Sequence, residues 1–128
     1  MRGEIYWCDF PPPQKDDDSR AALRRLVAVV SNDQLNRKVR TVIAVPMSTS
    51  VSARDSSRPT DVVIEPSDVN GLMTSSTLQA HLLTTVNKTQ LARHPIGELD
   101  EEIVFELDSA IRIALDLESD FDDFDVSP

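Results

Sequence analysis

Two stretches of the sequence decide the fold, and they read Arg25-Leu-Val-Ala-Val-Val-Ser-Asn-Asp33 and Thr41-Val-Ile-Ala-Val-Pro-Met-Ser-Thr49. Both are short runs rich in β-branched residues and bounded by polar ones, which is typical of buried strands. The first begins at an arginine, and the second ends at the hydroxyl of Ser48. If the two strands are neighbours, a guanidinium and a hydroxyl meet at the rim of one sheet, where a phosphate could bind.

Further strands are predicted around this pair. Residues 4–10 alternate between two faces, with Ile5 and Trp7 on one and Tyr6 and Cys8 on the other, as in a strand with at least one buried side. Pro46 donates no backbone hydrogen bond, so it should lie near the end of its strand. The full set of predicted strands covers residues 4–10, 23–30, 39–47, 61–65 and 77–86.

Turns and loops separate these strands. Proline and charge in residues 11–22, and Ser, Thr and Arg in residues 48–58, predict two long loops that flank the site. Ser31 is expected to cap a short helical turn over residues 32–37. A tight turn over residues 66–70 should end at Gly71, where positive φ carries no steric penalty.

One long helix is predicted over residues 99–117, with Asp100 as its N-cap. Its apolar residues recur at three- and four-residue spacing, so one stripe should pack on a sheet. The pattern predicts a mainly β (α+β) fold in which about five strands form a small, strongly bent β-barrel with a C-terminal α-helix. The stripe consists of Ile103, Leu107, Ala110, Ile111 and Ala114.

Composition limits the classes of protein that remain. With 128 residues, 40% hydrophobic and 27% charged, the chain is sized for one folded domain. Cys8 is the only cysteine and there are two histidines, so neither a metal site nor an intramolecular disulfide is expected, and Cys8 is interpreted as a small core residue. No apolar stretch is long enough to cross a bilayer, and no secretion signal is recognised, which predicts a cytoplasmic protein with no membrane partner.

Charge is unevenly distributed along the chain. The net charge is −9, and five of the negative charges fall in residues 118–128, which leaves −4 for residues 1–117. The sequence therefore divides into a domain over residues 1–117 and an acidic tail that we expect to be disordered. An acidic protein can still carry a basic groove, and eight basic residues fall between positions 20 and 58: Arg20, Arg24, Arg25, Arg37, Lys38, Arg40, Arg54 and Arg58.

Several motifs together resemble the MazF/PemK family of toxin ribonucleases. Besides the two opening stretches they are Arg2-Gly-Glu-Ile-Tyr-Trp-Cys-Asp-Phe10, Gly71-Leu72, Thr85-Val-Asn-Lys-Thr-Gln-Leu91 and Ile96-Gly-Glu-Leu99. The resemblance covers residues 1–117. It implies the SH3-like barrel shared by CcdB and PemK toxins, and a metal-independent endoribonuclease without a cofactor that cuts single-stranded RNA in a sequence-selective way. The 2′-hydroxyl would be the nucleophile, and the products would carry a 2′,3′-cyclic phosphate and a 5′-hydroxyl.

The resemblance also implies site residues. The arginine that opens the second strand and the hydroxyl after the third are the family's catalytic pair, and they correspond to Arg25 and Ser48. Arg24 and Thr49 are the alternatives if the register is off by one residue. Read from the residues alone, an arginine at a strand start or a serine after a strand is more often an ordinary surface group. The residues expected to contact RNA are Arg20, Arg54, Arg58, Thr77 and Gln79.

The chain departs from the family pattern at several positions. Leu26 replaces the usual proline after the arginine, and His81 stands where many members have an aspartate. Because histidine titrates near neutral pH, one hypothesis is that His81 assists proton transfer. The favoured interpretation is a half-buried sheet histidine with a water or backbone partner. His94, beside Pro95, is interpreted as structural.

Partners follow from the same resemblance. A cognate antitoxin is expected to inhibit the protein, which is expected to act as a homodimer, and the tail, with Phe121 and Phe124 among its carboxylates, resembles the acidic aromatic peptide of such antitoxins. Two alternatives remain: a CcdB-like toxin that binds DNA gyrase, and a degenerate member that binds only its antitoxin or RNA.

Overall fold

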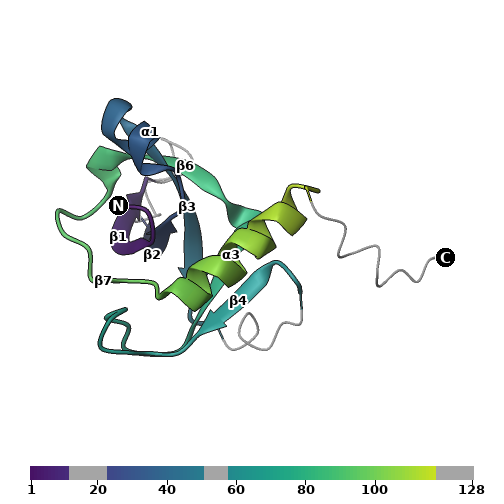
Figure 1. Cartoon of the computed structure of the whole chain (residues 1–128). Coiled ribbons are helices and arrows are strands. Elements are labelled where there is room, and N and C mark those ends of the chain that lie inside the picture. The colour runs from purple at the N-terminus through teal and green to yellow at the C-terminus, as the bar shows by residue number, and fades with distance from the viewer. Residues whose placement is uncertain (12–22, 51–57, 118–128) are drawn as a thin grey trace.

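Seven strands and one long helix account for most of the described chain. The computed structural model describes residues 1–11, 23–50 and 58–117. Figure 1 shows a strongly curved sheet with α3 (Glu101–Ala114) packed across it. The strands are β1 (Glu4–Phe10), β2 (Leu23–Val29), β3 (Thr41–Ser48), β4 (Asp61–Ile64), β5 (Ser76–Gln79), β6 (Thr84–Asn87) and β7 (Gly97–Glu98). The short helices are α1 (Asp33–Lys38) and the 3-10 turns η1 (Ala80–Leu82) and η2 (Lys88–Gln90).

Strand β3 is the centre of the sheet. The hydrogen-bonded order is β4-β5-β3-β2-β1-β7, and β6 also pairs with β3. All of these pairings are antiparallel. On the side away from β2, the first half of β3 pairs with β6 and its last two residues pair with β5. The sheet is strongly bent, and β3 changes its pairing partner along its length. The predicted mainly β, barrel-like fold with a C-terminal helix is confirmed.

Pro46 lies at that change of partner, and β3 continues past it to Ser48. The β6 ladder ends at Ala44 and the β5 ladder begins at Met47. Towards β2, Val30 N donates to Ile43 O at 2.9 Å, and hydrogen-bonded pairs alternate along an antiparallel ladder. Pro46, opposite Val27, therefore occupies a position that requires no donor, which explains how a proline fits in a central strand.

The prediction of one strand over residues 77–86 is wrong. β5 ends at Gln79, the turn η1 follows, and β6 begins at Thr84. The two strands pair with different parts of β3, so the chain must cross between them, and η1 makes this crossing with a Leu83 N to Ala80 O hydrogen bond of 3.1 Å. Alternating polarity does not reveal such a break.

The first helix begins one residue later than predicted. Its N-cap is Asn32, whose side chain accepts from Gln34 N at 2.7 Å, and not Ser31. The Ser31 hydroxyl instead donates to the buried Asn36 Oδ1 at 2.5 Å. Both residue types suit an N-cap, so the sequence alone did not distinguish them.

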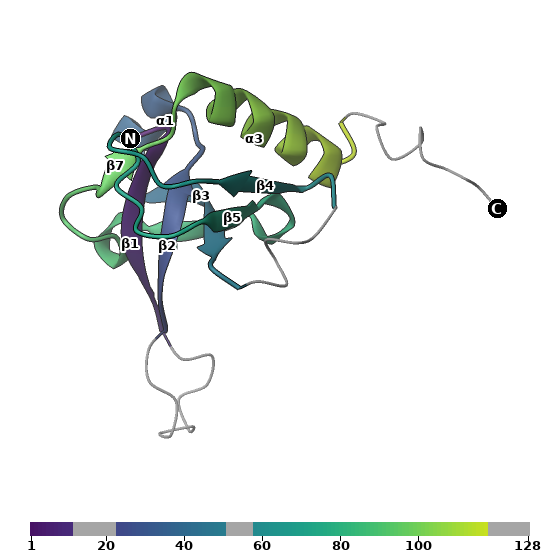
Figure 2. The ribbon, with the colours of Figure 1, turned by 90° about the horizontal axis from the view of Figure 1, so that it is seen from below.

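Helix α3 matches its predicted cap but is shorter than predicted. The Asp100 side chain accepts from Ile103 N at 2.9 Å. The residues that the helix buries are Leu107, Ala110 and Ile113, so Ile113 takes the place that the predicted stripe gave to Ala114. Figure 2 shows the helix lying along β4 and across the sheet. At 14 residues it is the longest helix of the described chain, and none there is long and apolar enough to cross a bilayer.

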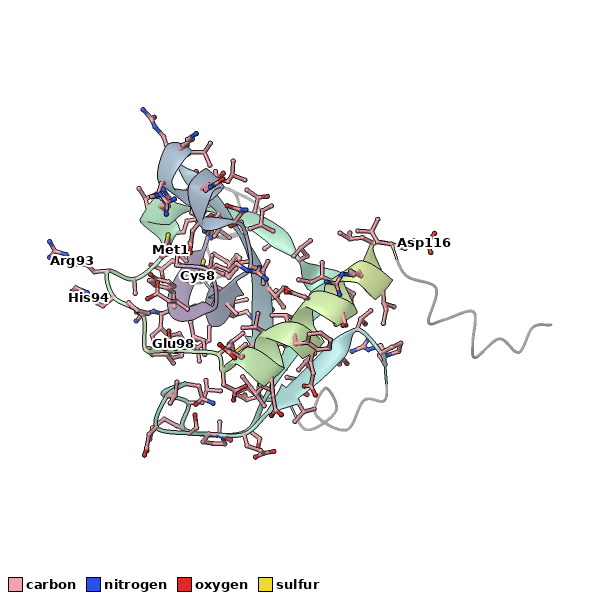
Figure 3. The ribbon with its side chains drawn as sticks, viewed as in Figure 1. Met1, Cys8, Arg93, His94, Glu98 and Asp116 are labelled. Carbon is pink, nitrogen blue, oxygen red and sulfur yellow. The ribbon has the colours of Figure 1, made fainter. Side chains whose placement is uncertain are left out.

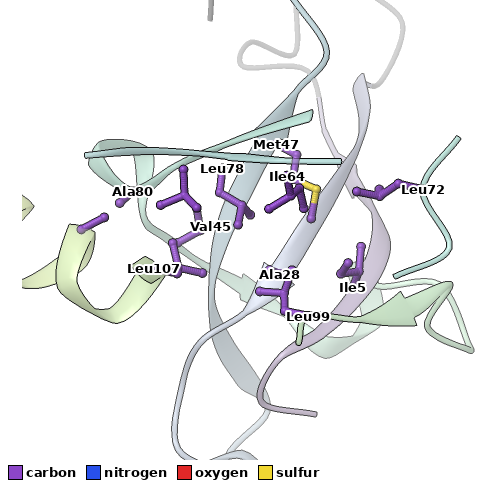
Figure 4. Packing of buried hydrophobic residues seen from close by; sticks show 12 residues of the cluster. Ile5, Ala28, Val45, Met47, Ile64, Leu72, Leu78, Ala80, Leu99 and Leu107 are labelled. Atoms are coloured by element: carbon purple, nitrogen blue, oxygen red, sulfur yellow. The ribbon is translucent and has the colours of Figure 1, made fainter. Parts of the chain in front are cut away.

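The sheet buries side chains on both faces. One cluster, shown in Figure 4, fills the space between the sheet and α3 and includes Ile5, Val45, Leu78 and Leu107. The second lies on the other face and includes Val27 and the fully buried Cys8, which confirms the interpretation of Cys8 as a core residue. Its other buried members are Tyr6, Val29, Val42, Ala44 and Val86.

Gly71 ends the predicted turn with φ of 70°. A larger residue here would be strained by the positive φ. It would also clash with the backbone, because its Cβ would lie 2.1 Å from Ile96 O. Within the turn, Ser67 N donates to Asn70 Oδ1 at 2.9 Å and Asn70 N donates to Ser67 Oγ at 3.1 Å. The predicted turn and its glycine are confirmed.

Candidate active site

Arg25, Ser48 and Thr77 form one row across three strands. Cys8 of β1 lies opposite Arg25 of β2, and Ser48 of β3 lies opposite Thr77 of β5. The pairing of Val27 with Pro46, continued by two residues, sets Arg25 against Ser48. Directly opposed residues of an antiparallel sheet share a face, so the cation and the hydroxyl that the sequence predicted at one rim lie on the same face of the sheet.

The guanidinium of Arg25 is held by neutral acceptors. Its Nη2 atom donates to Met47 O at 3.0 Å and to Gln79 Oε1 at 3.3 Å, and the side chain is half-buried. Within residues 1–11, 23–50 and 58–117, no carboxylate forms an ion pair with Arg25. Its positive charge therefore remains available to an anion such as a phosphate.

Among the described residues, the hydroxyl of Ser48 has one hydrogen-bond partner. Its Oγ accepts from Ser50 N at 3.0 Å, and the residue is half-buried. A serine hydroxyl has one proton to donate and two lone pairs, so Ser48 retains a donor for a substrate oxygen. Thr49, the alternative from the sequence, is exposed on the same cavity rim.

A cavity of about 460 Å³ opens beside this pair. Its apolar wall includes Trp7, which is 38% exposed, and the Arg24 guanidinium lies 5.3 Å from the centre of the indole ring. Arg24 Nε is also 3.7 Å from Asp9 Oδ1. An aromatic ring beside an arginine suits a nucleobase next to its phosphate. The lining residues are Trp7, Leu23, Arg24, Arg25, Leu26, Met47, Ser48, Thr49 and Ser76.

Of the five residues that the sequence predicted to contact RNA, the three that the structure describes lie in different surroundings. Gln79 touches the Arg25 guanidinium. Thr77 is fully buried, so the expectation that it contacts RNA is wrong for this structure. Arg58 forms an ion pair with Asp61, with both Nε and Nη2 3.1 Å from Oδ2. Arg20 and Arg54 lie outside the described residues.

The histidines lie away from the cavity. His81, on η1, has its Nδ1 3.8 Å from Asp61 Oδ1 and is not among the residues that line the cavity. His94 is exposed and points outward from the loop before β7 (Figure 3). The hypothesis that His81 assists proton transfer has no direct contact to support it.

Sequence reasoning missed the apolar wall of the cavity. Trp7, Leu26 and Met47 occupy strand positions, and none of them was predicted as a site residue. Trp7 could have been found, since its face of β1 ends at Asp9, and a large aromatic beside a polar strand end is a candidate for binding. The link from Gln79 to Arg25 joins two strands 54 residues apart, and no local motif indicates it.

Thiol chemistry is not supported. Burial raises the pKa of the Cys8 thiol to about 11, with a smaller contribution from the charge of Asp9, so Cys8 is neutral at physiological pH and is no thiolate nucleophile. In the described part of the chain, no three or more His, Cys, Asp or Glu side chains gather as a metal site.

Comparisons with known proteins place the chain in a family. Residues 1–115 match the family described as the PemK-like, MazF-like toxin of type II toxin-antitoxin systems. Endoribonuclease MazF2 of Mycobacterium bovis and endoribonuclease MazF6 of Mycobacterium tuberculosis are each 32% identical over 117 residues, which cover 91% of this chain and 96% of theirs. A solved mycobacterial endoribonuclease in complex with its cognate antitoxin superposes with a TM-score of 0.69 at 27% identity, covering 92% of this chain and 96% of that one. The chain therefore belongs to the PemK/MazF family of type II toxin-antitoxin toxins.

Proposed function

We propose that the protein is a metal-independent endoribonuclease toxin that cuts single-stranded RNA. The observation that carries the proposal is the guanidinium of Arg25, free of any carboxylate partner in the described chain and set beside the Ser48 hydroxyl at the rim of a cavity. Two relatives that align with 91% of the chain are endoribonucleases by name. The site and the relatives therefore support the same activity.

The chemistry uses the substrate's own nucleophile. The 2′-oxygen attacks phosphorus, the bond from phosphorus to the 5′-oxygen breaks, the 2′-proton is lost and the leaving oxygen gains a proton. The products carry a 2′,3′-cyclic phosphate and a 5′-hydroxyl. Arg25 stabilises the charge that develops on the phosphorane oxygens, and this is the larger contribution expected of the site. Ser48, whose hydroxyl both donates and accepts, hydrogen bonds the reacting oxygens.

The substrate and partners follow from the shape and charge of the site. A cavity with a partly exposed indole suits an unstacked base of single-stranded RNA better than a duplex. A cognate antitoxin would inhibit the toxin by occupying the surface around Arg25, and the solved mycobacterial relative is bound to its own antitoxin. We further propose that the toxin acts as a homodimer in the cytoplasm, where its RNA substrate is found.

The test is incubation of the purified protein with a long single-stranded RNA in EDTA, followed by analysis of both new ends. We expect discrete cuts, a cyclic phosphate on one side and a 5′-hydroxyl on the other. A 5′-phosphate product, or cutting that requires added Mg²⁺, would contradict the mechanism. Intact RNA together with inhibition of DNA gyrase would favour the CcdB-like alternative.

A further inference from the structure

We propose that Thr77 and Gln79 of β5 are positioning residues, with Gln79 orienting Arg25 and Thr77 orienting Ser48. The inference deepens the proposed ribonuclease function and rests on it. It gives β5 a role in the reaction although neither residue lines the cavity. Four observations carry it: the face of β5 that the two residues share, the bond to Arg25, the burial of Thr77 and the register of Ser48.

Both residues lie on the catalytic face of β5. Leu78 and Ala80 belong to the core cluster under α3, and side chains alternate along a strand. Thr77 and Gln79 therefore point to the opposite face, which also carries Arg25 and Ser48. The two catalytic residues thus come from β2 and β3. Their neighbours come from β5, where Gln79 contacts Arg25 and Thr77 is paired with Ser48.

Gln79 fixes the direction of the guanidinium. Arg25 Nη2 is shared between Met47 O of β3 at 3.0 Å and Gln79 Oε1 of β5 at 3.3 Å. Two acceptors from two strands restrict a side chain that is otherwise long and flexible. Because both acceptors are neutral, they aim the cation without neutralising it, and the remaining N–H groups stay available for the phosphate.

Thr77 has an unused hydroxyl beneath Ser48. The residue is fully buried, and its Oγ1 has no hydrogen-bond partner among the described residues. A buried hydroxyl without a partner is unfavourable. Ser48 lies directly opposite in the ladder, where Cβ atoms are about 5 Å apart, so a rotation of the two side chains brings the hydroxyls within hydrogen-bond distance.

A hydrogen bond from Thr77 would fix the direction in which the Ser48 hydroxyl points its proton. Its Oγ already accepts from Ser50 N and has a second lone pair for the Thr77 hydroxyl. With both lone pairs occupied, the Ser48 proton is directed away from the protein and towards the substrate oxygen. Thr77 therefore acts through Ser48 and touches no RNA.

The experiment compares variants that keep or remove each polar group. Thr77→Val removes the hydroxyl at nearly constant shape and should lower kcat about tenfold with little change in KM, while Thr77→Ser should retain most of kcat. Gln79→Leu removes the acceptor and should also lower kcat about tenfold. Thr85→Val on the exposed part of β6 and Gln34→Leu on α1 are matched controls that should cut RNA like the wild type.

A double-mutant comparison separates positioning from packing. In a Ser48→Ala background, Thr77→Val should cause no further loss, because the group through which it acts is absent. A kcat of Thr77→Val equal to that of the wild type overturns the assignment of Thr77. So does an equal loss in Thr77→Ser, which would indicate packing.

Nuclear magnetic resonance tests the same contacts without RNA, so failure of the positioning proposal and failure of the ribonuclease proposal are distinguishable. The Arg25 side-chain N–H signals should shift in Gln79→Leu and not in Gln34→Leu. The Thr77 hydroxyl proton should exchange slowly and show a through-space contact to Ser48. Unshifted Arg25 signals in folded Gln79→Leu overturn the role of Gln79. A Thr77 hydroxyl that contacts only water in the wild type overturns the role of Thr77, and this measurement needs no variant to fold.

Discussion

Arg25 Nη2 lies 3.0 Å from the carbonyl oxygen of Met47, the residue immediately before Ser48. The hydrogen bond ties the cation on the third residue of β2 to the backbone that carries the hydroxyl at the end of β3. The bonded residues are separated by 22 positions in the sequence, yet a contact between neighbouring strands helps to set the relative position of cation and hydroxyl.

Arg25→Ala should abolish RNA cleavage while the protein stays folded. The substitution removes the only cation that the row carries to the developing phosphorane charge, and loss of such a group lowers the rate by roughly 100-fold or more. The measurement is single-turnover cleavage beside a circular dichroism spectrum. Arg93→Ala, an exposed arginine on the loop before β7 (Figure 3), should cut normally. Wild-type rates for folded Arg25→Ala would show that the catalytic assignment is wrong.

Ser48→Ala should lose activity and Ser48→Thr should keep it, because the hydroxyl is the group required. We expect a loss of about tenfold or more for the alanine variant, the size of one missing hydrogen bond in a transition state. Initial rates on one RNA substrate decide between the variants. Equal losses would indicate packing, and a larger loss for Thr49→Ala would move the catalytic hydroxyl by one residue.

His81→Asn should change the cleavage rate by less than about threefold, since the imidazole faces Asp61 and lies outside the cavity. The informative measurement is kcat against pH for the wild type and the variant. If one limb of the wild-type profile disappears in His81→Asn, the histidine takes part in proton transfer after all, and the family's missing carboxylate has a functional replacement.

Removing residues 118–128 should strengthen RNA binding at low salt. The tail carries five side-chain carboxylates and no basic residue, and carboxylates compete with phosphates for arginines wherever they reach them. The gain of a chain ending at Leu117 should shrink as ionic strength rises and the Debye length falls below about 10 Å. Equal affinities of the full-length and shortened chains at roughly 20–50 mM salt would remove any inhibitory role of the tail.

Stability should fall at alkaline pH because of Tyr6 and Cys8. Burial, with the hydrogen bond to Glu4, raises the pKa of Tyr6 from 10.0 to about 12, and burial raises that of Cys8 from 9.0 to about 11. The unfolded chain therefore loses these protons first, so the stabilisation is complete below about pH 9 and is lost as the pH rises through the folded values. Each group contributes about 3 kcal/mol, at most, to the decline.

Urea unfolding between neutral pH and about pH 11 measures this decline. Cys8→Ala should show a smaller fall between roughly pH 9 and 10 than the wild type, because only Cys8 titrates in that window of the unfolded chain. A free energy of unfolding that stays constant over the whole range would contradict both assignments.

The sequence predicted those parts of the fold that local pattern determines. Alternation in β1, the β-branched runs of β2 and β3, and the Asp100 cap each depend on neighbours within a few residues. The break at η1 was not predicted, because it arises from the two different stretches of β3 with which β5 and β6 pair. Long-range pairing has no signature inside residues 77–86.

The site divides in the same way. Arg25 and Ser48 were predicted as site residues because each flanks a recognisable apolar run, and the predicted closeness of the two is what the register shows. Gln79 and Thr77 were selected as RNA contacts because polar residues on a strand suggest an exposed face. Thr77 is nevertheless fully buried, and Gln79 is contacted by Arg25 from β2. Whether a polar residue is exposed depends on which other parts of the chain cover it, and its polarity alone does not show this.

Pro46 has a consequence for how faithfully the barrel assembles. A slip of β3 by one residue against β2 would turn Ser48 towards the core and would also bring the proline nitrogen to a position where the ladder needs a donor. The same slip causes both errors, so two separate effects destabilise the misaligned chain. Pro46, two residues before Ser48, therefore disfavours the shifted register. In that register the barrel could still form, but Ser48 would no longer share a face with Arg25, and the toxin would be inactive.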